Sequence, residues 1–465
     1  MPSGLDGWVA HPEFLRELDE ARELVRAHPG RWRIIYHYDG DGIASASAAI
    51  RALQRLGYPF HATPFVGVQR DRMAALLART KGPALVVDTG ASWLDVAGQH
   101  PAPVVVLDHH TYPGMEHPAK LPQHVRMVNP LDWGVDGMSE LSAASLTWLF
   151  SIHLDARNWD NAPWGLSGAI ADRQHIGGLR GLNRRLADGA IERSLLEPRR
   201  GLLLTGPTVA EALARSVDPY IRGLSGRMGA VKSLLVETHI GADQAPLALS
   251  SDESQALSGA VRARLESQEV RPEFLEVVDQ EDWRIPSLGL SATELSNLQN
   301  ATGRESEPGV GIALALGDAE ALKRARGAEE RWRSGLLNGL RRLEEGGVNG
   351  LPHVQWFESP ETTLAGTQAG LAMTYLLDPS RPVFVFSTSV DGRVLKVSGR
   401  GTLYLVSRGL DLATVCRSAA ADVGGEGGGH RVASGATIPL EARDRFLASA
   451  DALVGQQLPS PGAGA

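Results

Sequence analysis

Eight histidine and aspartate side chains occur in short groups whose chemistry suits divalent cations. They are His37, Asp39 and Asp41 in one group, Asp88 alone, Asp108, His109 and His110 together, and Asp172 further along. Imidazole and carboxylate ligands without thiolates favour Mn²⁺ or Mg²⁺, and the histidines tilt this choice toward Mn²⁺. The set exceeds the needs of one ion, so two ions about 4 Å apart, bridged by a carboxylate, would use all of it. Cations would also allow several carboxylates to stay ionised in a small site.

Individual members of this set have simpler structural interpretations. Asp41 could cap a helix that begins near Ile43, and Asp108 could be a turn residue. Helix caps and turns would have to account for four separate groups at once, although each group consists of residue types that bind metal ions. The metal interpretation is therefore favoured.

Three short apolar runs lead into these groups, at residues 34–39, 84–88 and 104–108. Continuous β-branched runs of this length are typical of strands that are buried on both faces of a parallel sheet. Helical patterns at 43–56 and 71–77 lie between the runs, which predicts a doubly wound α/β domain. Ligands in such folds bind beyond the carboxyl ends of the strands, so we expect the groups to meet there.

The remaining chain predicts further elements on both sides of a middle region that is harder to assign. We expect helices at 12–27, 139–150, 164–172, 318–343 and 410–421, and strands at 383–386, 394–397 and 402–406. A glycine-rich loop at 424–429 follows, directly before His430. The expected domain limits are 1–205, 206–346 and 347–456, and the Pro/Gly/Ala-rich tail at 457–465 is expected to be disordered.

Composition limits the class of protein. The chain has 465 residues, enough for two or three domains, and its 46 Lys+Arg against 54 Asp+Glu give a net charge of −8. A polyanionic partner must therefore meet a local basic patch. The single cysteine, Cys416, excludes a disulfide within the chain and favours a reducing, cytoplasmic location. We expect no membrane association, because no apolar run approaches about 20 residues and no signal pattern is present.

The motifs His37-Tyr38-Asp39-Gly40-Asp41-Gly42, Val87-Asp88, Asp108-His109-His110 and Gly168 to Asp172 resemble, in this order, the four motifs of the DHH phosphoesterase superfamily. Gly424 to His430, continued by residues 433–436, resembles the glycine-rich signature of the DHH-associated C-terminal domain, and residues 398–401 resemble its other substrate motif. Residues 171–175 and 181–184 look most like the archaeal RecJ-like nucleases, some of which associate with the replicative helicase through the GINS complex.

This resemblance implies an α/β fold in two parts. A DHH domain with a parallel sheet flanked by helices would occupy residues 1–205, and a smaller α/β DHH-associated domain would occupy 347–456 across a cleft. Residues 206–346 would be an inserted or connecting region that could bind a partner.

The resemblance also assigns roles to residues. His37, Asp39 and Asp88 would hold one ion, and Asp41, Asp88, His109 and Asp172 the other, with Asp88 bridging. His110 would contact the scissile phosphate, and Asp108 would orient a ligand histidine. We expect Asp88, His109, His110 and Asp108 to be the catalytic residues. The substrate would be held by His110, Arg400, Gly428, Gly429, His430 and Ser434.

The leading prediction is a phosphodiesterase with two Mn²⁺ ions, or alternatively Mg²⁺. It would digest single-stranded DNA from the 5′ end and release mononucleotides, in DNA replication or repair; RNA stays open as a substrate. One alternative is a hydrolase of short oligoribonucleotides or cyclic dinucleotides, which should not need the long middle region. Another is a replisome adaptor that binds GINS through this region and has only secondary nuclease activity.

Overall fold

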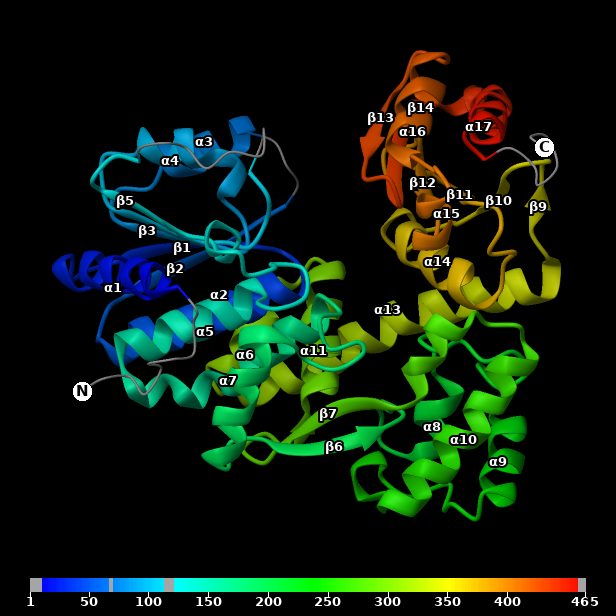
Figure 1. Cartoon of the computed structure of the whole chain (residues 1–465), viewed down its shortest axis with the longest axis horizontal. Coiled ribbons are helices and arrows are strands. Elements are labelled where there is room, and N and C mark those ends of the chain that lie inside the picture. Colours follow the sequence, from blue (N-terminus) through cyan, green and yellow to red (C-terminus); the bar gives the residue numbers. More distant parts are fainter. Residues whose placement is uncertain (1–10, 67–69, 113–120, 459–465) are drawn as a thin grey trace. The chain divides into compact units, whose positions relative to one another are not determined.

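The computed structural model describes residues 11–66, 70–112 and 121–458. Gln457, the first residue of the tail expected to be disordered, instead ends a helix, and the tail from 459 onward lies outside the described residues. The chain divides into two compact units (Figure 1). Unit 1 comprises residues 1–203 and 280–330, and unit 2 comprises 204–279 and 331–465. The middle region 206–346 thus contributes to both units, and helix α13 (Ala319–Gly346) begins in the first and ends in the second.

Unit 1 is built around a five-stranded sheet of strands that are all parallel, in the order β2-β1-β3-β4-β5. The strands are β1 (Trp32–His37), β2 (Phe60–Phe65), β3 (Ala84–Val87), β4 (Val104–Leu107) and β5 (Val125–Val128). Three of them match the predicted apolar runs. The polar residues after β1, β3 and β4 therefore come together at one edge of the sheet, as the strand pattern predicted.

Helices cover both faces of this sheet (Figure 1). Ile34 packs with α1 (Pro12–Ala27), α2 (Gly40–Arg55) and α5 (Ala143–Leu154), whereas Ile35 packs with α3 (Arg70–Ala78) and α4 (Leu94–Gly98). Successive strand residues point to opposite faces of the sheet. Because helices cover both faces, the runs are apolar throughout. Burial of this sheet on both faces confirms the predicted α/β class.

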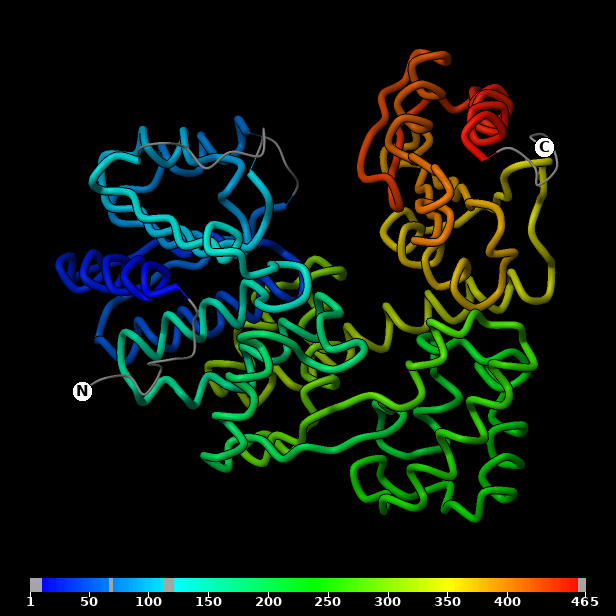
Figure 2. Tube along the Cα trace, in the orientation of Figure 1, coloured from blue at the N-terminus to red at the C-terminus, as the bar shows by residue number. Residues whose placement is uncertain are grey.

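A segment distant in sequence completes unit 1. Strands β6 (Glu197–Gly201), β7 (Gln280–Ile285) and β8 (Leu290–Ser291) form a small antiparallel sheet that leads into α11 (Ala292–Arg304) and α12 (Pro308–Ala315). Both helices pack against α2, and α11 also packs against α6 (Ala162–Ala171), as the trace shows (Figure 2). Helix α7 (Gly181–Glu192) packs on α6 as well.

Unit 2 combines a helical part with a mixed six-stranded sheet in the order β13-β14-β12-β11-β10-β9. Its strands are β9 (Asn349–Gly350), β10 (Gln355–Glu358), β11 (Val383–Thr388), β12 (Val394–Arg400), β13 (Glu426–Gly429) and β14 (Ala433–Pro439). Its helices are α8 (Val209–Ala214), α9 (Met228–Glu237), α10 (Ser251–Ser267), α14 (Thr362–Tyr375), α15 (Leu403–Ser407), α16 (Leu412–Ala421) and α17 (Arg443–Gln457). Only β10 and β11 run parallel to each other in this sheet.

Two predictions for unit 2 were wrong. Residues 402–406 were expected as a strand but form helix α15, because the Thr402 hydroxyl accepts a hydrogen bond from Leu405 N at 3.2 Å and caps a helical turn. The glycine-rich stretch was expected as a loop, but residues 426–429 form β13, an edge strand that pairs with β14. An apolar run of five residues does not distinguish a strand from a short helix, and consecutive glycines hide a strand's alternation.

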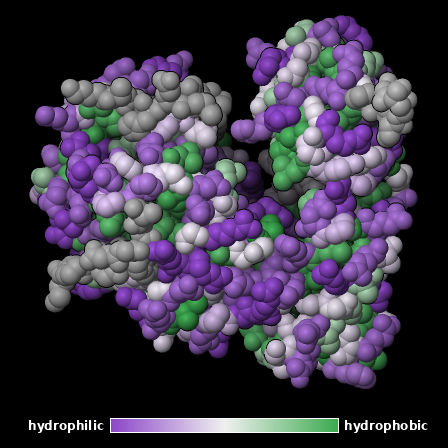
Figure 3. Space-filling view, viewed as in Figure 1, coloured by the Kyte–Doolittle hydropathy of each residue, from purple (hydrophilic) through white to green (hydrophobic). Residues whose placement is uncertain are grey.

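The visible surface is largely hydrophilic, with apolar residues scattered across it (Figure 3). Among the described residues, no helix combines the length and apolar character that crossing a membrane requires.

Candidate metal centre

The predicted ligands of unit 1 meet at the carboxyl edge of the parallel sheet. His37 is the last residue of β1, Asp88 follows β3 directly, and Asp108 follows β4. Ligand atoms from all eight predicted positions fall into three overlapping groups, in each of which the atoms lie within 4.8 Å of one another. The groups are His37, Asp39 and Asp88; Asp41, His109 and Asp172; and Asp88, Asp108, His109 and His110.

The turn between β1 and α2 places the first two aspartates. Asp39 caps α2, and its carboxylate accepts a hydrogen bond from Gly42 N at 3.2 Å. A Cβ atom at Gly42 would lie 2.1 Å from the carbonyl oxygen of His37, so only glycine allows this turn. The opposite carboxylate oxygen of Asp39 lies 3.0 Å from His37 Nδ1.

Asp41 lies where three helices meet, and it is 1% exposed. Its two oxygens accept hydrogen bonds from Ala143 N at 2.9 Å and Ala144 N at 3.0 Å, in the first turn of α5. The alternative role of Asp41 as the cap of its own helix is therefore wrong, because Asp39 caps that helix, and Asp41 instead binds the first-turn amides of α5. On the other side, a Cβ atom at Gly168 of α6 would lie 2.2 Å from Asp41 Oδ1, so a side chain there would collide with this carboxylate.

Asp88 lies between the two outer groups. Its Oδ2 is 3.6 Å from His37 Nδ1, and its Oδ1 is 3.4 Å from His109 Nε2. The residue is buried and has a φ of 56°, a left-handed conformation that is unusual for a residue other than glycine. A carboxylate whose two oxygens face two different groups has the arrangement that a bridging ligand needs.

His109 points its Nε2 into the second group, 3.5 Å from Asp172 and 3.9 Å from Asp41. Its Nδ1 lies 2.7 Å from the carbonyl oxygen of Gly137. Because a carbonyl only accepts, Nδ1 carries a proton, so Nε2 is the nitrogen that can release its proton and offer a lone pair to a metal. Support from a carbonyl is typical of metal-binding histidines.

Two buried side-chain amides support this histidine through its carbonyl partner, and the sequence alone assigns neither of them a role. Gln174 Nε2 donates to the same Gly137 carbonyl at 2.8 Å, and Asn183 Nδ2 donates to Gln174 Oε1 at 2.7 Å. These two amides fix the carbonyl that orients His109. The only signal in the sequence was the position of Gln174 and Asn183 inside the motifs after Asp172.

Asp108 supports His110 rather than the ligand histidine that we expected. Its carboxylate accepts hydrogen bonds from His110 Nδ1 at 2.7 Å, Ala91 N at 2.8 Å and His109 N at 2.8 Å. The last two bonds fix the loops after β3 and β4. The bond to His110 leaves the Nε2 of this exposed imidazole available to a substrate.

The pKa shifts in the centre indicate that its histidines do not neutralise all of the charge that its aspartates would carry when ionised. Burial and the nearby Asp88 raise the pKa of Asp41 to about 7, and burial with Asp41 raises the pKa of Asp172 well above its ordinary value. Burial alone would lower the pKa of His37, but Asp39 and Asp88 raise it to about 11. The pKa of His109 is likewise raised, against the effect of burial, by Asp88, Asp172 and Asp41. Carboxylates and imidazoles that both retain protons mark a site suited to cations.

Arg304 is a cation beside this centre that the sequence did not reveal. It ends α11, lies 3.1 Å from the Tyr38 hydroxyl, and stacks over the Tyr38 ring at 5.5 Å from its centroid. Together with His37 and Gly42 N, it overcomes the effect of burial and lowers the pKa of Asp39. No local motif marks this residue, because the distant segment 280–330 carries it to the site.

The donor set fits the divalent cations that we expected. All ligand atoms are imidazole nitrogens or carboxylate oxygens, and the chain's single thiol, Cys416, is buried in unit 2. His37, Asp39 and Asp88 could hold one ion, and Asp41, Asp88, His109 and Asp172 a second. Sites built from imidazole and carboxylate ligands without thiolates accept divalent cations of this kind.

Five of the six residues expected to hold substrate lie in unit 2, whereas the sixth, His110, lies in unit 1. Arg400 ends β12 and pairs in register with Ala433, while Ser434 of β14 lies between Gly399 and Gly429 on the neighbouring strands. The hydroxyl of Ser434 donates to His430 O at 3.3 Å, which closes the turn between β13 and β14. Arg400, Gly428, Gly429, His430 and Ser434 therefore share one end of the mixed sheet.

Glycines are required along β13 because the strand is tightly enclosed. A Cβ atom at Gly427 would lie 2.3 Å from the carbonyl oxygen of Cys416, and one at Gly429 would lie 2.7 Å from Ser434 Oγ. Gly428, in contrast, has no atom within 4 Å of such a position. The backbone at Gly428 is thus open to close approach by a ligand.

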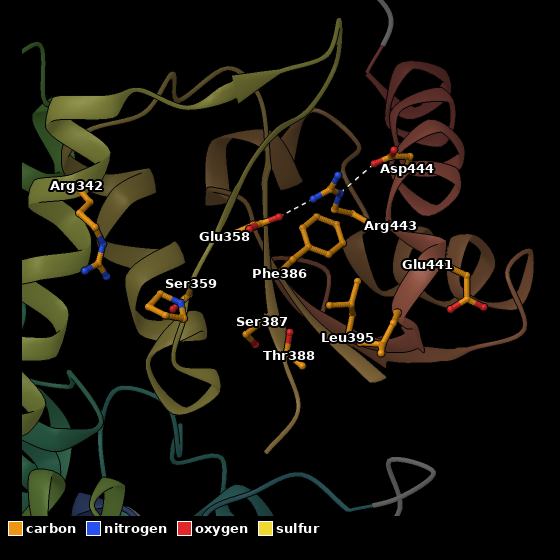
Figure 4. Close-up of a pocket in the computed structure, with 12 residues that line it drawn as sticks. Arg342, Glu358, Ser359, Phe386, Ser387, Thr388, Leu395, Glu441, Arg443 and Asp444 are labelled. Carbon is orange, nitrogen blue, oxygen red and sulfur yellow. Dashed lines mark hydrogen bonds and ion pairs between the residues drawn. The ribbon is translucent and has the colours of Figure 1, made fainter. Parts of the chain in front are cut away.

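The opposite end of the same sheet holds a cavity of about 740 Å³ (Figure 4). Its walls include Glu358, Ser387, Thr388, Leu395 and Arg443, and Arg443 pairs with Glu358 and with Asp444. None of the expected substrate residues lines it.

Comparisons with known proteins agree with this arrangement. The parallel sheet gathers aspartates and histidines at its carboxyl edge, and a mixed sheet with a glycine-rich edge strand follows later in the chain. Residues 31–169 match the DHH family N-terminal domain, and residues 363–456 match the DHHA1 domain. The chain therefore belongs to the DHH family and is a hydrolase that acts on phosphoester bonds.

Similar proteins share the whole architecture. An uncharacterized protein of Methanocaldococcus jannaschii is 26% identical over 455 residues, which cover 96% of this chain and 99% of the relative. RecJ of Thermus thermophilus in complex with Mn²⁺ aligns with a TM-score of 0.58 at 18% identity, over 97% of this chain but 56% of that one. This chain thus spans little more than half the length of that RecJ.

CDC45 of Entamoeba histolytica aligns with a TM-score of 0.64 at 11% identity, over 95% of this chain and 98% of that one. At such identities both structural similarities establish the fold. The chain is accordingly a DHH-family protein with a RecJ-like fold, which confirms the resemblance seen in its motifs.

Proposed function

We propose that the chain is a Mn²⁺-dependent exonuclease that degrades single-stranded DNA from its 5′ end to mononucleotides. The observation that carries this proposal is the placement of Asp88 between two ligand groups, 3.6 Å from His37 and 3.4 Å from His109. Every ligand position holds a histidine or an aspartate, which favours catalysis over a purely scaffolding role. The digestion polarity and the DNA preference come from the RecJ-like motifs.

Two bound ions would supply a hydroxide nucleophile at neutral pH and neutralise charge on the phosphate. Around them, the protein's own residues orient the reactants. His109, held by Gly137, presents Nε2 as a ligand, and His110, held by Asp108, presents Nε2 to the substrate. Asp108 outweighs the effect of burial and raises the pKa of His110, so its Nε2 can donate a hydrogen bond to a phosphate oxygen.

In unit 2, we assign substrate binding to the end of the mixed sheet that carries Arg400 and His430. A guanidinium suits bidentate contact with a phosphate, and the backbone of Gly428 is open to close approach. We also propose a cytoplasmic location, because a chain with a single cysteine suits a reducing compartment.

The test is a product ladder from 5′- and 3′-labelled DNA and RNA, from dinucleotides to long strands, with Mn²⁺ and Mg²⁺ compared. We expect mononucleotides from the 5′ end of long single-stranded DNA, with Mn²⁺ preferred. Asp88→Asn should lower turnover roughly 10²–10³-fold, the scale of losing a principal electrostatic group. Asp71→Asn, which changes an exposed aspartate of α3, is the matched control and should leave turnover unchanged.

Other outcomes would replace this proposal. Cleavage confined to dinucleotides or cyclic dinucleotides would indicate the small-nucleotide hydrolase. Absence of cleavage on every substrate, together with retention of GINS by the intact chain, would indicate the adaptor. Full activity of Asp88→Asn in a preparation free of contaminating nuclease would remove the ligand cluster from the reaction.

A further inference from the structure

The short helix α15 exposes two large apolar side chains beside the expected substrate residues. Leu403 is 77% exposed and Tyr404 is 41% exposed. The helix begins three residues after Arg400, and Leu405 anchors it by packing fully buried in the core of unit 2. The exposed pair is therefore held on a fixed support.

Arginine side chains hold the ring of Tyr404 in place. The guanidinium carbon of Arg271 lies 4.2 Å from the ring centroid, and that of Arg408 lies 5.7 Å away. Arg271 is itself oriented by Glu273, with Nε 2.6 Å from Oε1, and Arg408 Nη1 is 3.5 Å from the Tyr404 hydroxyl. The aromatic ring thus has a defined position although Tyr404 is 41% exposed.

A packing role does not account for this arrangement. Leu405 and Leu410 fill the core beneath the helix, whereas Leu403 and Tyr404 lie outside it. An exposed aromatic ring flanked by guanidinium groups is, however, the usual means of holding a single-stranded nucleic acid. The ring stacks with a base, and the cations meet neighbouring phosphates.

The location is consistent with such a role. Arg400, Ser434 and His430 share the end of the sheet from which α15 starts, in the same compact unit. The net charge of the chain is −8, so a nucleic acid needs a local group of cations, and Arg271 and Arg408 provide two of them within 6 Å of the ring centroid, at 4.2 and 5.7 Å.

We propose that Tyr404, braced by Arg271 and Arg408, is a stacking platform for one base of a single strand whose end is held near Arg400. This inference rests on the proposed function and adds a residue of unit 2 that recognises the strand. Stacking tolerates every base, so the platform grips strands without sequence preference.

Binding of fluorescent oligodeoxynucleotides to the full chain in EDTA tests the platform without turnover. We expect Tyr404→Ala to weaken affinity about 5- to 100-fold, the range that loss of base–aromatic stacking gives. Tyr404→Phe should keep the affinity of the unchanged chain, because it keeps the ring. Leu403→Ala, which removes the neighbouring exposed side chain, is the matched control and should have no effect.

A second measurement is independent of affinity. Photocrosslinking with an oligonucleotide that carries 5-iododeoxyuridine, followed by peptide mass spectrometry, should label Tyr404, and Tyr404→Leu should abolish this crosslink. Equal affinity of Tyr404→Ala and the unchanged chain, or equal losses in the Phe and Ala variants, would overturn the platform. Failure of the unchanged chain to bind any single strand would instead overturn the proposed nuclease function.

Discussion

At the scale of single residues, the centre depends on two imidazoles, each of which is oriented by a hydrogen bond at Nδ1. His109 is fixed by the carbonyl of Gly137 and His110 by the carboxylate of Asp108, so each imidazole offers Nε2. The residues of the candidate ligand cluster could be named from the sequence because their types and spacing are distinctive. Gln174, Asn183 and Arg304 could not, since amides and arginines are common and their roles follow from contacts made only in the folded chain.

The two amides that support His109 give the first residue-scale prediction. Gln174→Met removes the donor to Gly137 O at nearly constant volume, which frees the carbonyl and loosens the histidine. We expect Mn²⁺ affinity, measured by calorimetry, to fall about 10- to 100-fold, as is usual for residues that support a metal ligand. Gln368→Met is the matched control. Gln368 is also buried and donates to a glycine carbonyl, but in unit 2, so its loss should leave Mn²⁺ affinity unchanged.

The raised pKa values predict how the metal-free protein responds to pH. The pKa of Asp41 rises from 3.8 to about 7, and that of His37 from 6.5 to about 11, so the folded state holds protons that the unfolded state has released. Stability of the EDTA-treated chain should therefore fall as pH rises through these windows. Thermal melts from pH 6 to pH 9 should show a decreasing Tm, and saturating Mn²⁺ should flatten the decrease. A Tm that increases over this range without metal would contradict the charge balance described for the centre.

At the scale of elements, strand ends and helix starts place the ligands. Strands β1, β3 and β4 were predictable because burial on both faces leaves uninterrupted apolar runs. Helix α15 and strand β13 were not, because Thr402 caps a turn inside an apolar run and glycines carry no pattern. The sequence also did not predict that residues 280–330 belong to the first unit. These residues contact α2 and α6, which lie more than 100 residues earlier in the chain.

Close packing of α2, α5 and α6 around Asp41 gives a prediction at this scale. Gly168→Ala would place a Cβ atom 2.2 Å from Asp41 Oδ1 and 2.3 Å from the Cβ of Ala144. We expect a loss of about 1–3 kcal/mol in the free energy of unfolding, together with weaker Mn²⁺ binding. Denaturant titration with calorimetry would measure both quantities.

The control for this substitution is Gly259→Ala in α10, where no atom lies within 4 Å of the added Cβ. Alanine is the better helix former, so this change should stabilise the chain by roughly 0.5–1 kcal/mol. The same chemical change would then have opposite signs at two helical positions. A Gly168→Ala chain as stable as its parent, with unchanged metal affinity, would show that the helices do not close on Asp41.

At the scale of the whole molecule, charge is distributed unevenly. The net charge of −8 repels nucleic acid at long range, while unit 1 concentrates aspartates that require cations and unit 2 presents arginines around one end of its sheet. Bound divalent ions would reverse the sign of the charge at the edge of the parallel sheet. Metal binding would thus let the scissile phosphate approach the centre, and the proposed hydrolysis depends on it, whereas the proposed binding of a strand by unit 2 does not.

Anomalous diffraction at the manganese edge, from crystals of the full chain grown with Mn²⁺, tests this condition most directly. The geometry predicts two peaks about 4 Å apart on either side of Asp88, one beside His37 and Asp39, the other beside His109 and Asp172. A cluster without manganese, or with a single ion that Asp88 does not contact, would contradict the two-metal centre and the phosphodiesterase chemistry proposed for it.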